Sequence, residues 1–335
     1  MSDDRPIIVL GCPRSGTTLL QVMLHSHPRI AIPPENRFVL PAYRERLRFG
    51  DLEERTNRRA LAKFIVRRRG HRFRDLGLDR RWTIRQIVKG PPTLGSAIGI
   101  VLRAYAERFD RPRWGDKRPN YHSHIDVIMR LFPDAQIVHV VRDPRDCVAS
   151  LKRMKWWKLD TYHAVSAWAQ SIDNTDEAER RWPGVVTRVQ YEYLVADPET
   201  ELRKLCAALG EEYDPAMAEP ERVAPVAVPE RKHWHINTRL SPTTKQVGRW
   251  RTDLEPWEAA LCETVLAGRM TSFGYELGGG GRRPPAEHLA RYALVRAVRR
   301  LARRKRLLKD GWEKRHERNP VAAMLTHGQR SRVGL

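Results

Sequence analysis

Apolar residues along the chain follow two patterns, short continuous runs and longer stretches in which they recur every three or four positions. The helical spacing predicts long amphipathic helices, including residues 161–182 and residues 199–209, with Gly210 as a C-cap. Strands that alternate with helices predict an α/β fold with a parallel sheet flanked by helices. Three continuous runs predict these strands: residues 6–11 (PIIVLG), 136–141 (QIVHVV) and 185–194 (VVTRVQYEYL).

Less regular segments separate these elements. Residues 114–121 (WGDKRPNY) are polar and rich in turn formers, which predicts a loop. Residues 278–285 (GGGGRRPP) have the composition of a linker, and residues 291–315 beyond it predict a basic amphipathic helix. We therefore expect a single α/β domain over residues 1–278, followed by a glycine-rich linker and a basic helical tail over residues 279–335.

The chain carries a formal charge of +22, from 62 Lys and Arg against 40 Asp and Glu. Residues 282–335 hold 16 Lys and Arg against 4 Asp and Glu, a net +12, so the rest of the chain holds +10. The excess therefore belongs more to the tail than to the main domain, and it does not by itself predict nucleic-acid binding by that domain. The tail helix is compatible with a solvated face packed on the core, an anionic membrane surface, an acidic substrate or a nucleic acid.

The four cysteines are scattered, because no two of them form C-x-x-C and no His/Cys cluster has zinc spacing. Scattered single cysteines are typical of a reducing compartment. The N-terminal residues MSDDRP do not form the basic start of a signal peptide, and the longest apolar runs are too short to span a membrane. We therefore expect a cytoplasmic protein without an integral membrane segment and without a metal.

The first strand leads into GCPRSGTTLL, residues 11–20, which continues as a helix. Gly11 and Gly16 match the phosphate-binding loop G-x-x-x-x-G-K-[ST], but Thr17 stands where that loop has its lysine. Backbone N–H groups of such a loop and of the following helix bind anions. The missing lysine argues against a triphosphate but not against a single 5′-phosphate, so we expect a P-loop-like fold with another ligand. Four side chains add charge or hydroxyl donors: Arg14, Ser15, Thr17 and Thr18.

A second anion site is predicted where the strand over residues 136–141 ends. Arg142 follows this strand directly, and Ser150 lies eight residues later on the next helix. An arginine and a hydroxyl there can hold a separate phosphate, and an internal ion pair from Arg142 to Asp146 is the alternative. Asp143 stands where a nucleotide kinase would need a magnesium ligand, but Asp before proline is also typical of a helix N-cap.

Two phosphate sites without a triphosphate lysine fit 3′-phosphoadenosine 5′-phosphosulfate (PAPS), and here the chain resembles the PAPS-dependent sulfotransferase family. It looks closest in motif to the tyrosylprotein-type and bacterial branch, and the resemblance extends from Pro6 to Tyr275. It implies in-line transfer of a sulfuryl group to an acceptor hydroxyl or amine, with PAPS as co-substrate and no metal. The motifs are CPRSGTT for the 5′-phosphosulfate, VVRDPRDCVAS for the 3′-phosphate and VGRWR in a late loop.

The same resemblance implies which residues catalyse the reaction. In SHPRIAIPPENRF, residues 26–38, it assigns Glu35 as the general base and Arg37 as a charged, substrate-binding residue beside it. It places Lys117 at the sulfuryl group and its leaving oxygen, and it gives Arg14 the loop position of a lysine in the cytosolic steroid and phenol branch. A carboxylate near Arg14 and Lys117 would stay ionised, which suits a base.

Two further nucleotide contacts are implied by the resemblance. Tyr191, at the end of the third predicted strand, would contact the nucleotide, with core packing as the alternative. Arg249 in SPTTKQVGRWR would reach the 3′-phosphate, and Trp250 would pack against the nucleotide or the core. Other candidates in this loop are Ser241, Thr243, Thr244 and Lys245.

Two other classes of protein stay open on the residues alone. One is a nucleotide-dependent phosphotransferase of the P-loop kinase type with Asp143 on magnesium, against which the missing lysine counts. The other is a non-enzymatic protein whose tail binds nucleic acid or an anionic surface, against which the ordered motifs of the core count. The acceptor is a hydroxyl- or amine-bearing glycan, lipid, peptide or natural product, and neither its identity nor the oligomeric state is indicated.

Overall fold

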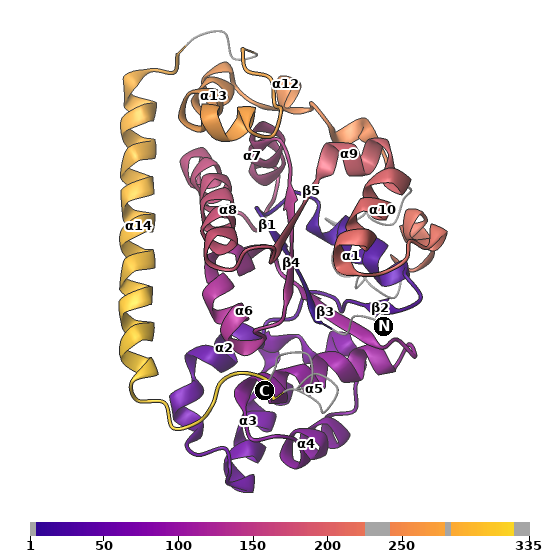
Figure 1. Cartoon of the computed structure of the whole chain (residues 1–335). Helices are drawn as coiled ribbons and strands as arrows, with labels where there is room; N and C mark the ends of the chain where they lie inside the picture. The colour runs from indigo at the N-terminus through magenta and orange to yellow at the C-terminus, as the bar shows by residue number, and fades with distance from the viewer. Residues whose placement is uncertain (1–4, 225–241, 279–282, 325–335) are drawn as a thin grey trace.

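The computed structural model describes residues 5–224, 242–278 and 283–324, and its centre is a parallel five-stranded sheet with helices on both sides (Figure 1). The strand order is β2-β3-β1-β4-β5, and β1 pairs in parallel with β3 on one side and β4 on the other. The predicted α/β class with a parallel sheet is confirmed. The strands are β1 Ile7–Gly11, β2 Ile30–Ala31, β3 Arg113–Lys117, β4 Gln136–Val141 and β5 Val186–Gln190.

Helices cover both faces of the sheet, which explains the apolar runs. Ile7 and Val9 of β1 pack in a cluster with α1, α9 and α10, whereas Ile8 and Leu10 pack in a cluster with α3 and α5. Successive residues of a strand face opposite sides, so a strand buried on both faces reads as continuously apolar. The helices are α1 Thr17–Ser26, α2 Val39–Arg44, α3 Arg55–Arg67, α4 Arg80–Lys89, α5 Leu94–Glu107, α6 Ile125–Leu131, α7 Pro144–Lys152, α8 Thr161–Arg181, α9 Tyr191–Ala196, α10 Pro198–Leu209, α12 Trp250–Asp253, α13 Pro256–Thr271 and α14 Ala286–Lys314.

The loop predicted over residues 114–121 is wrong in its first part, because residues 113–117 form the inner strand β3. All five residues of this strand, RWGDK, are buried although three of them are charged. Arg113 donates to Glu211 at 3.0 Å, and Asp116 accepts hydrogen bonds from other buried groups. Buried charges are tolerated when they are paired, so a strand that carries them does not show the apolar pattern of its neighbours.

The third predicted strand is also shorter than expected. β5 ends at Gln190, and Tyr191 begins helix α9 instead of ending a strand. Tyr191 and Leu194 are buried, whereas Tyr193 is 56% exposed, and this three-residue spacing is helical. In a strand, Tyr191 and Tyr193 would face the same side. The aromatic residues suggested a strand because their strand propensity is high, but the helix still begins directly after the end of β5.

Two predicted helix ends are confirmed. Asp143 is the N-cap of α7, where its side chain accepts the N–H of Arg145 and Pro144 takes the first helical position. Gly210 ends α10 with φ of 77°, the left-handed conformation that favours glycine. The predicted tail helix corresponds to α14, which runs along the outside of α8 (Figure 1).

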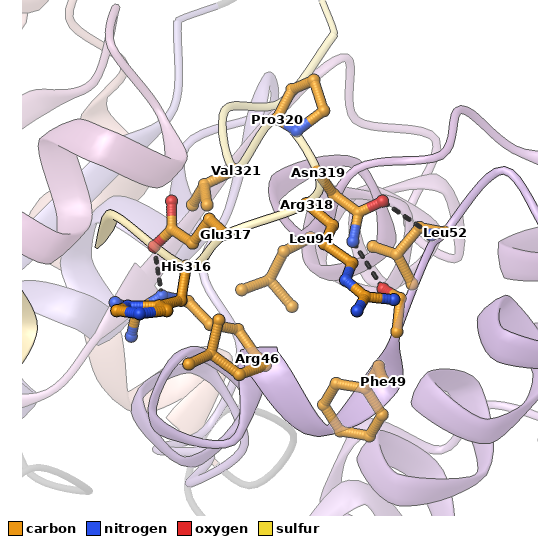
Figure 2. A pocket seen from close by; sticks show the side chains of 12 residues that line it. Arg46, Phe49, Leu52, Leu94, His316, Glu317, Arg318, Asn319, Pro320 and Val321 are labelled. Atoms are coloured by element: carbon orange, nitrogen blue, oxygen red, sulfur yellow. Dashed lines mark hydrogen bonds and ion pairs between the residues drawn. The ribbon is translucent and has the colours of Figure 1, made fainter. Parts of the chain in front are cut away.

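The last turns of α14 and the residues just after it are held by a cluster of buried charges. Arg46 has only 5% of its side chain exposed, and it donates to Asp310 at 2.9 Å, to Glu313 at 2.8 Å and to Glu317. Figure 2 shows this arginine beside Glu317, across a small cavity from Asn319. The Asn319 side chain accepts the Leu52 N–H and donates to the Gly50 carbonyl, shortly after Arg46 in the chain. Removing one member of such a buried ionic group typically costs about 3–5 kcal/mol.

Candidate active site

The first part of the site is the tight loop between β1 and α1. The Ser15 N–H donates to the Cys12 carbonyl at 3.1 Å, which closes a turn. Arg14 and Gly16 have φ angles of 73° and 101°, so the chain enters the left-handed region twice before α1 begins at Thr17. Gly16 is the N-cap and has no capping side chain, which leaves the first N–H groups of α1 oriented toward an anion.

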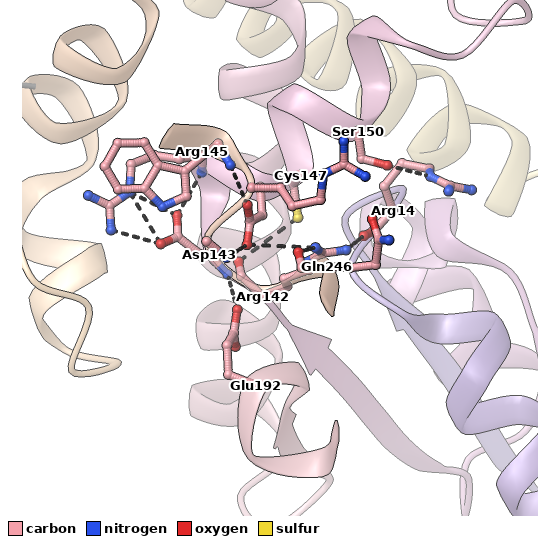
Figure 3. Close-up of polar contacts among 12 residues, drawn as sticks. Arg14, Arg142, Asp143, Arg145, Cys147, Ser150, Glu192 and Gln246 are labelled. Carbon is pink, nitrogen blue, oxygen red and sulfur yellow. Dashed lines mark hydrogen bonds and ion pairs between the residues drawn. The ribbon is translucent and has the colours of Figure 1, made fainter. Parts of the chain in front are cut away.

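The second part lies at the end of β4, beside this loop, because β1 and β4 are neighbours in the sheet (Figure 3). Arg142 Nη1 donates to the Arg14 carbonyl at 3.2 Å, and the guanidinium lies 4.4 Å from the centre of the Tyr191 ring. Arg142 also forms an ion pair with Asp146 at 3.6 Å, the alternative that the sequence left open. Groups from the loop, from α7 and from α9 therefore hold this buried arginine in place.

Arg14 joins the two parts. Its Nε donates to Ser150 Oγ on α7 at 3.0 Å. Burial, together with the charge of nearby Arg142, lowers the pKa of Arg14 to about 10. Both guanidinium groups remain protonated at neutral pH, and two cations held this close are stabilised by a bound anion. The structure thus brings together four predicted residues, Arg14, Arg142, Ser150 and Tyr191.

Lys117 ends β3 beneath the start of α1. Its Nζ donates to Thr18 Oγ1 at 3.2 Å. Burial lowers the pKa of the Lys117 ammonium below its usual value, against the opposing effect of the Glu35 and Asp116 charges. Burial also raises the pKa of Asp116 to about 6, although this carboxyl accepts the Tyr121 hydroxyl. Lys117 is therefore a buried cation close to both the loop and Glu35.

Glu35 lies in the segment between β2 and α2, after two prolines. Its Oε1 is 3.8 Å from Arg37 Nε and 3.9 Å from Arg72 Nη1. Arg37 was predicted to stand beside Glu35, but Arg72 comes from a separate turn and was not predicted. The carboxylate is thus surrounded by cations, including Lys117, which favours its ionised form.

The late loop approaches the site through its backbone. The Gly248 and Trp250 N–H groups donate to Asp146 at 2.8 and 2.9 Å, and the Gln246 carbonyl accepts from Arg142. Arg142 and Asp146, which form an ion pair just after β4, therefore also hold this loop in position. Trp250 itself is buried and lies 4.0 Å beneath the guanidinium of Arg145, so it packs in the core.

A cavity of about 780 Å³ unites these parts, within the range of about 300–1,000 Å³ that is typical of ligand sites. Ser15 and Lys117 do not line it, because both are buried beneath its wall. Among the other late-loop candidates, Ser241 lies outside the described residues, and residues 243–245 do not line the cavity. The predicted residues that do line it are Arg14, Gly16, Thr17, Thr18, Glu35, Arg37, Arg142, Ser150, Tyr191 and Arg249.

Several lining residues were missed by the sequence analysis. Arg118 directly follows Lys117, and Arg153 follows Ser150 by three positions, so both stand next to predicted residues. That proximity is the only local signal for them. Arg72 has no such signal, because its segment meets Glu35 only through tertiary packing. The missed lining residues are Arg72, Arg118, Pro119, Asn120, Arg153, Met154, Trp156 and Gln246, with Pro13 and Leu19 beside the loop.

Replacing Gly16 by alanine should disrupt the loop. A Cβ there would lie 2.4 Å from Cδ2 of the Tyr191 ring, and the φ of 101° is strained for any side chain. We expect the free energy of unfolding of Gly16→Ala to fall by more than about 1 kcal/mol, measured by urea denaturation.

Gly268→Ala is the matched control for this change. Gly268 lies inside α13 with nothing within 4 Å of the added Cβ, so alanine should leave stability equal or raise it by up to about 1 kcal/mol. A Gly16→Ala protein as stable as the Gly268→Ala protein would contradict the loop geometry.

The loop, Arg142 and the cavity together form an anion-binding site at the carboxyl ends of two adjacent strands. Ligands of open parallel sheets bind at the carboxyl ends of the strands, and here two adjacent strand ends offer separate groups for anions. Such a site suits a nucleotide with two separate anionic groups and a reacting partner beside it.

Comparison with known proteins gives the family. Residues 6–215 match the sulfotransferase family, and this match covers more than half of the chain. The chain therefore belongs to the sulfotransferase family. The predicted family membership and enzyme class are confirmed.

Relatives and solved structures agree with this family. Nodulation protein NoeE of Sinorhizobium fredii is 26% identical over 295 residues, which cover 80% of this chain and 65% of that protein. Protein-tyrosine sulfotransferase A of Caenorhabditis elegans is 24% identical over 223 residues, 65% of this chain and 53% of that protein. The chain thus spans between half and two thirds of the length of these curated relatives.

The sulfotransferase domain of the Synechococcus PCC 7002 olefin synthase superposes with a TM-score of 0.56 at 26% identity, covering 82% of this chain and 97% of that domain. The sulfotransferase domain of the curacin biosynthetic pathway superposes with a TM-score of 0.55 at 22% identity, covering 83% of this chain and 100% of that domain. Both domains share the fold of this chain.

Proposed function

We propose that this chain transfers the sulfuryl group of PAPS to an acceptor hydroxyl or amine, with Glu35 as the general base. The observation that carries the proposal is that one cavity joins the loop before α1, Arg142 with the Arg14–Ser150 pair, and Glu35. The loop suits the 5′-phosphosulfate, and the strand-end arginine with its serine neighbour suits the separate 3′-phosphate. Arg249, on the late loop, lines the same cavity and suits the second phosphate.

Unused polar atoms support an anionic ligand. Within the described part of the chain, Arg142 Nε and Ser15 Oγ are buried and lack a hydrogen-bond partner. Buried donors of this kind normally have partners, and an unpaired one costs about 1–3 kcal/mol. Arg142 lines the cavity, where a phosphate oxygen would supply a partner for this arginine, whereas Ser15 lies beneath the wall.

The reaction requires one bond to form as another breaks. The acceptor oxygen or nitrogen attacks sulfur, its proton passes to Glu35, and the bond from sulfur to the bridging oxygen of the 5′-phosphate breaks to release 3′-phosphoadenosine 5′-phosphate (PAP). The leaving phosphate gains negative charge in this step. Arg14 at the cavity wall and Lys117 beneath Thr18 are two cations beside the loop that can stabilise that charge.

The ion pairs of Asp143 favour sulfuryl transfer over the kinase alternative. Both carboxylate oxygens of Asp143 accept from the Arg145 guanidinium, the closer contact being 2.7 Å, and Asp143 does not line the cavity. Asp143 therefore caps α7 and pairs with Arg145, so it is not placed to bind magnesium in the cavity. The relatives named as protein-tyrosine sulfotransferases support a hydroxyl as the acceptor group.

The test is calorimetric titration of the purified protein with PAP in EDTA, and with ATP and magnesium in parallel. We expect PAP to bind in EDTA and ATP with magnesium to bind far more weakly, because the loop lacks the lysine that meets β- and γ-phosphates. Binding of ATP with magnesium, without PAP binding, would contradict the proposal.

A further inference from the structure

The tail helix α14 carries an exposed apolar row on its outer side. The row consists of five residues that are each between 53% and 67% exposed: Leu294, Val298, Leu301, Leu308 and Trp312. Successive members are three, four or seven positions apart, so they share one side of a helix with about 3.6 residues per turn. At about 1.5 Å per residue the row is about 27 Å long. Scattered apolar residues on a surface are ordinary, but five on one side of a helix over this length indicate an interaction surface.

Basic residues surround this outer row. Lys305 lies within it, between Leu301 and Leu308, and the others lie within a quarter-turn of it on either side. Glu287, at the start of the helix, is the acid on this side among the described residues of α14. The exposed basic residues of the outer side are Arg291, Arg304, Lys305, Lys309 and Arg315.

A different set of arginines attaches the opposite side of α14 to the core. Arg296 donates to Asp173 at 3.0 Å and Arg303 to Glu177 at 2.6 Å, both on α8. Arg299 and Arg306 continue this inner line, with Gln170 of α8 and Asp126 of α6 as partners: the Arg299–Gln170 distance is 2.7 Å and the closest Arg306–Asp126 distance is 3.2 Å. Packing on the core therefore accounts for the inner arginines of the tail and for Arg291, whose guanidinium lies 5.3 Å from the centre of the Tyr162 ring, but not for the outer row or its other basic neighbours.

We propose that the outer row of α14 binds the anionic surface of a lipid bilayer. The helix would lie in the interfacial plane, with its apolar row among the acyl chains and its basic residues at the headgroups, as basic amphipathic helices do. Within the described ranges no helix is long and apolar enough to cross a bilayer, so the contact is peripheral. This inference is independent of the proposed function.

Charge and polarity together favour an anionic bilayer over a second copy of the chain or a nucleic acid as the partner of the outer row. A second copy of the chain would bring two basic rows face to face, and like charges in an interface disfavour association. A nucleic acid would match the charge, but its phosphates would leave the leucines and Trp312 unburied. An anionic bilayer matches both the positive charge and the apolar side chains.

The experiment is co-sedimentation of the full chain with phosphatidylcholine vesicles that contain or lack phosphatidylglycerol. We expect partition onto the anionic vesicles only, and weaker partition when salt is raised from about 0.1 M to about 1 M, which shortens the screening length from about 10 Å to about 3 Å. Leu301→Ser/Leu308→Ser should lower the partition at least about tenfold, because it removes two large apolar side chains from the row that enters the bilayer.

Leu47→Ser/Leu159→Ser is the matched control, because both leucines are exposed but lie outside α14. This variant should partition like the native chain. The tryptophan fluorescence of the native chain should shift to shorter wavelength on anionic vesicles, and Trp312→Phe should remove most of that shift.

Three results would overturn the proposal. The first is equal partition onto neutral and anionic vesicles, or none onto either. The second is unchanged partition of Leu301→Ser/Leu308→Ser, which would make the contact purely electrostatic. The third is a dimer seen by light scattering that this variant dissociates, which would assign the outer row to a second copy. Thermal unfolding of each variant verifies that it is folded, and PAP binding is measured separately.

Discussion

Glu35→Gln should lower turnover by about 10²- to 10⁴-fold, the usual contribution of a general base, while PAP binds nearly as before. The amide keeps the size of the side chain and its place beside Arg37 and Arg72, but it cannot take the acceptor's proton. Product formation with PAPS and an acceptor gives the turnover, and calorimetry gives the affinity for PAP.

Glu45→Gln provides a matched comparison. Glu45 also lies between two arginines, 3.5 Å from Arg48 and 4.0 Å from Arg68, but it does not line the cavity. It should retain full turnover. If Glu35→Gln and Glu45→Gln were equally active, Glu35 would not be the base, whereas an equal loss of turnover and PAP affinity in Glu35→Gln would make it a binding residue.

Arg142→Met should weaken PAP binding by about 10- to 100-fold or more. Hydrogen bonds to a charged group contribute about 1.5–3 kcal/mol each, and Arg142 also holds the Arg14 and Gln246 backbone in position. Its loss therefore removes a cation from the proposed 3′-phosphate site and loosens both loops that surround it. Calorimetric titration with PAP measures the effect.

Arg145→Met separates binding from stability in this experiment. Arg145 is also buried and lies over an aromatic ring, that of Trp250, but its ion pairs go to Asp143 and Glu263, away from the cavity. We expect Arg145→Met to unfold at lower temperature with its PAP affinity kept. Equal PAP affinities of the two variants, both folded, would remove Arg142 from the nucleotide site.

The parts of the fold that could be predicted are those with a local cause. The strand over residues 136–141 is buried on both faces, so its sequence had to be apolar, and the α7 cap depends on two adjacent residues, Asp143 and Pro144. β3 was missed because its charges are neutralised by residues such as Glu211, about a hundred positions away. No window of sequence contains that pairing.

The residues of the site also divide into those with a local signal in the sequence and those without one. Arg14 and Gly16 lie in one continuous motif, so their roles were open to prediction from residue type and spacing. Arg72 and Gln246 reach the cavity from separate segments, and their positions depend on how those segments pack. Lys117 was assigned to the site by resemblance alone, and the structure places it beneath Thr18 and not at the cavity wall.

The carboxylate cluster around Arg46 affects when this part of the chain can fold during synthesis. Asp310 lies 264 positions after Arg46, and its two companions follow it, so none of the three carboxylates exists while the ribosome is still adding the sheet and α8. Until then the nascent domain holds an uncompensated cation at a position that is buried in the finished protein. Domains otherwise tend to fold as they emerge, so we expect the segment around Arg46 to reach its buried arrangement only after α14 has been synthesised.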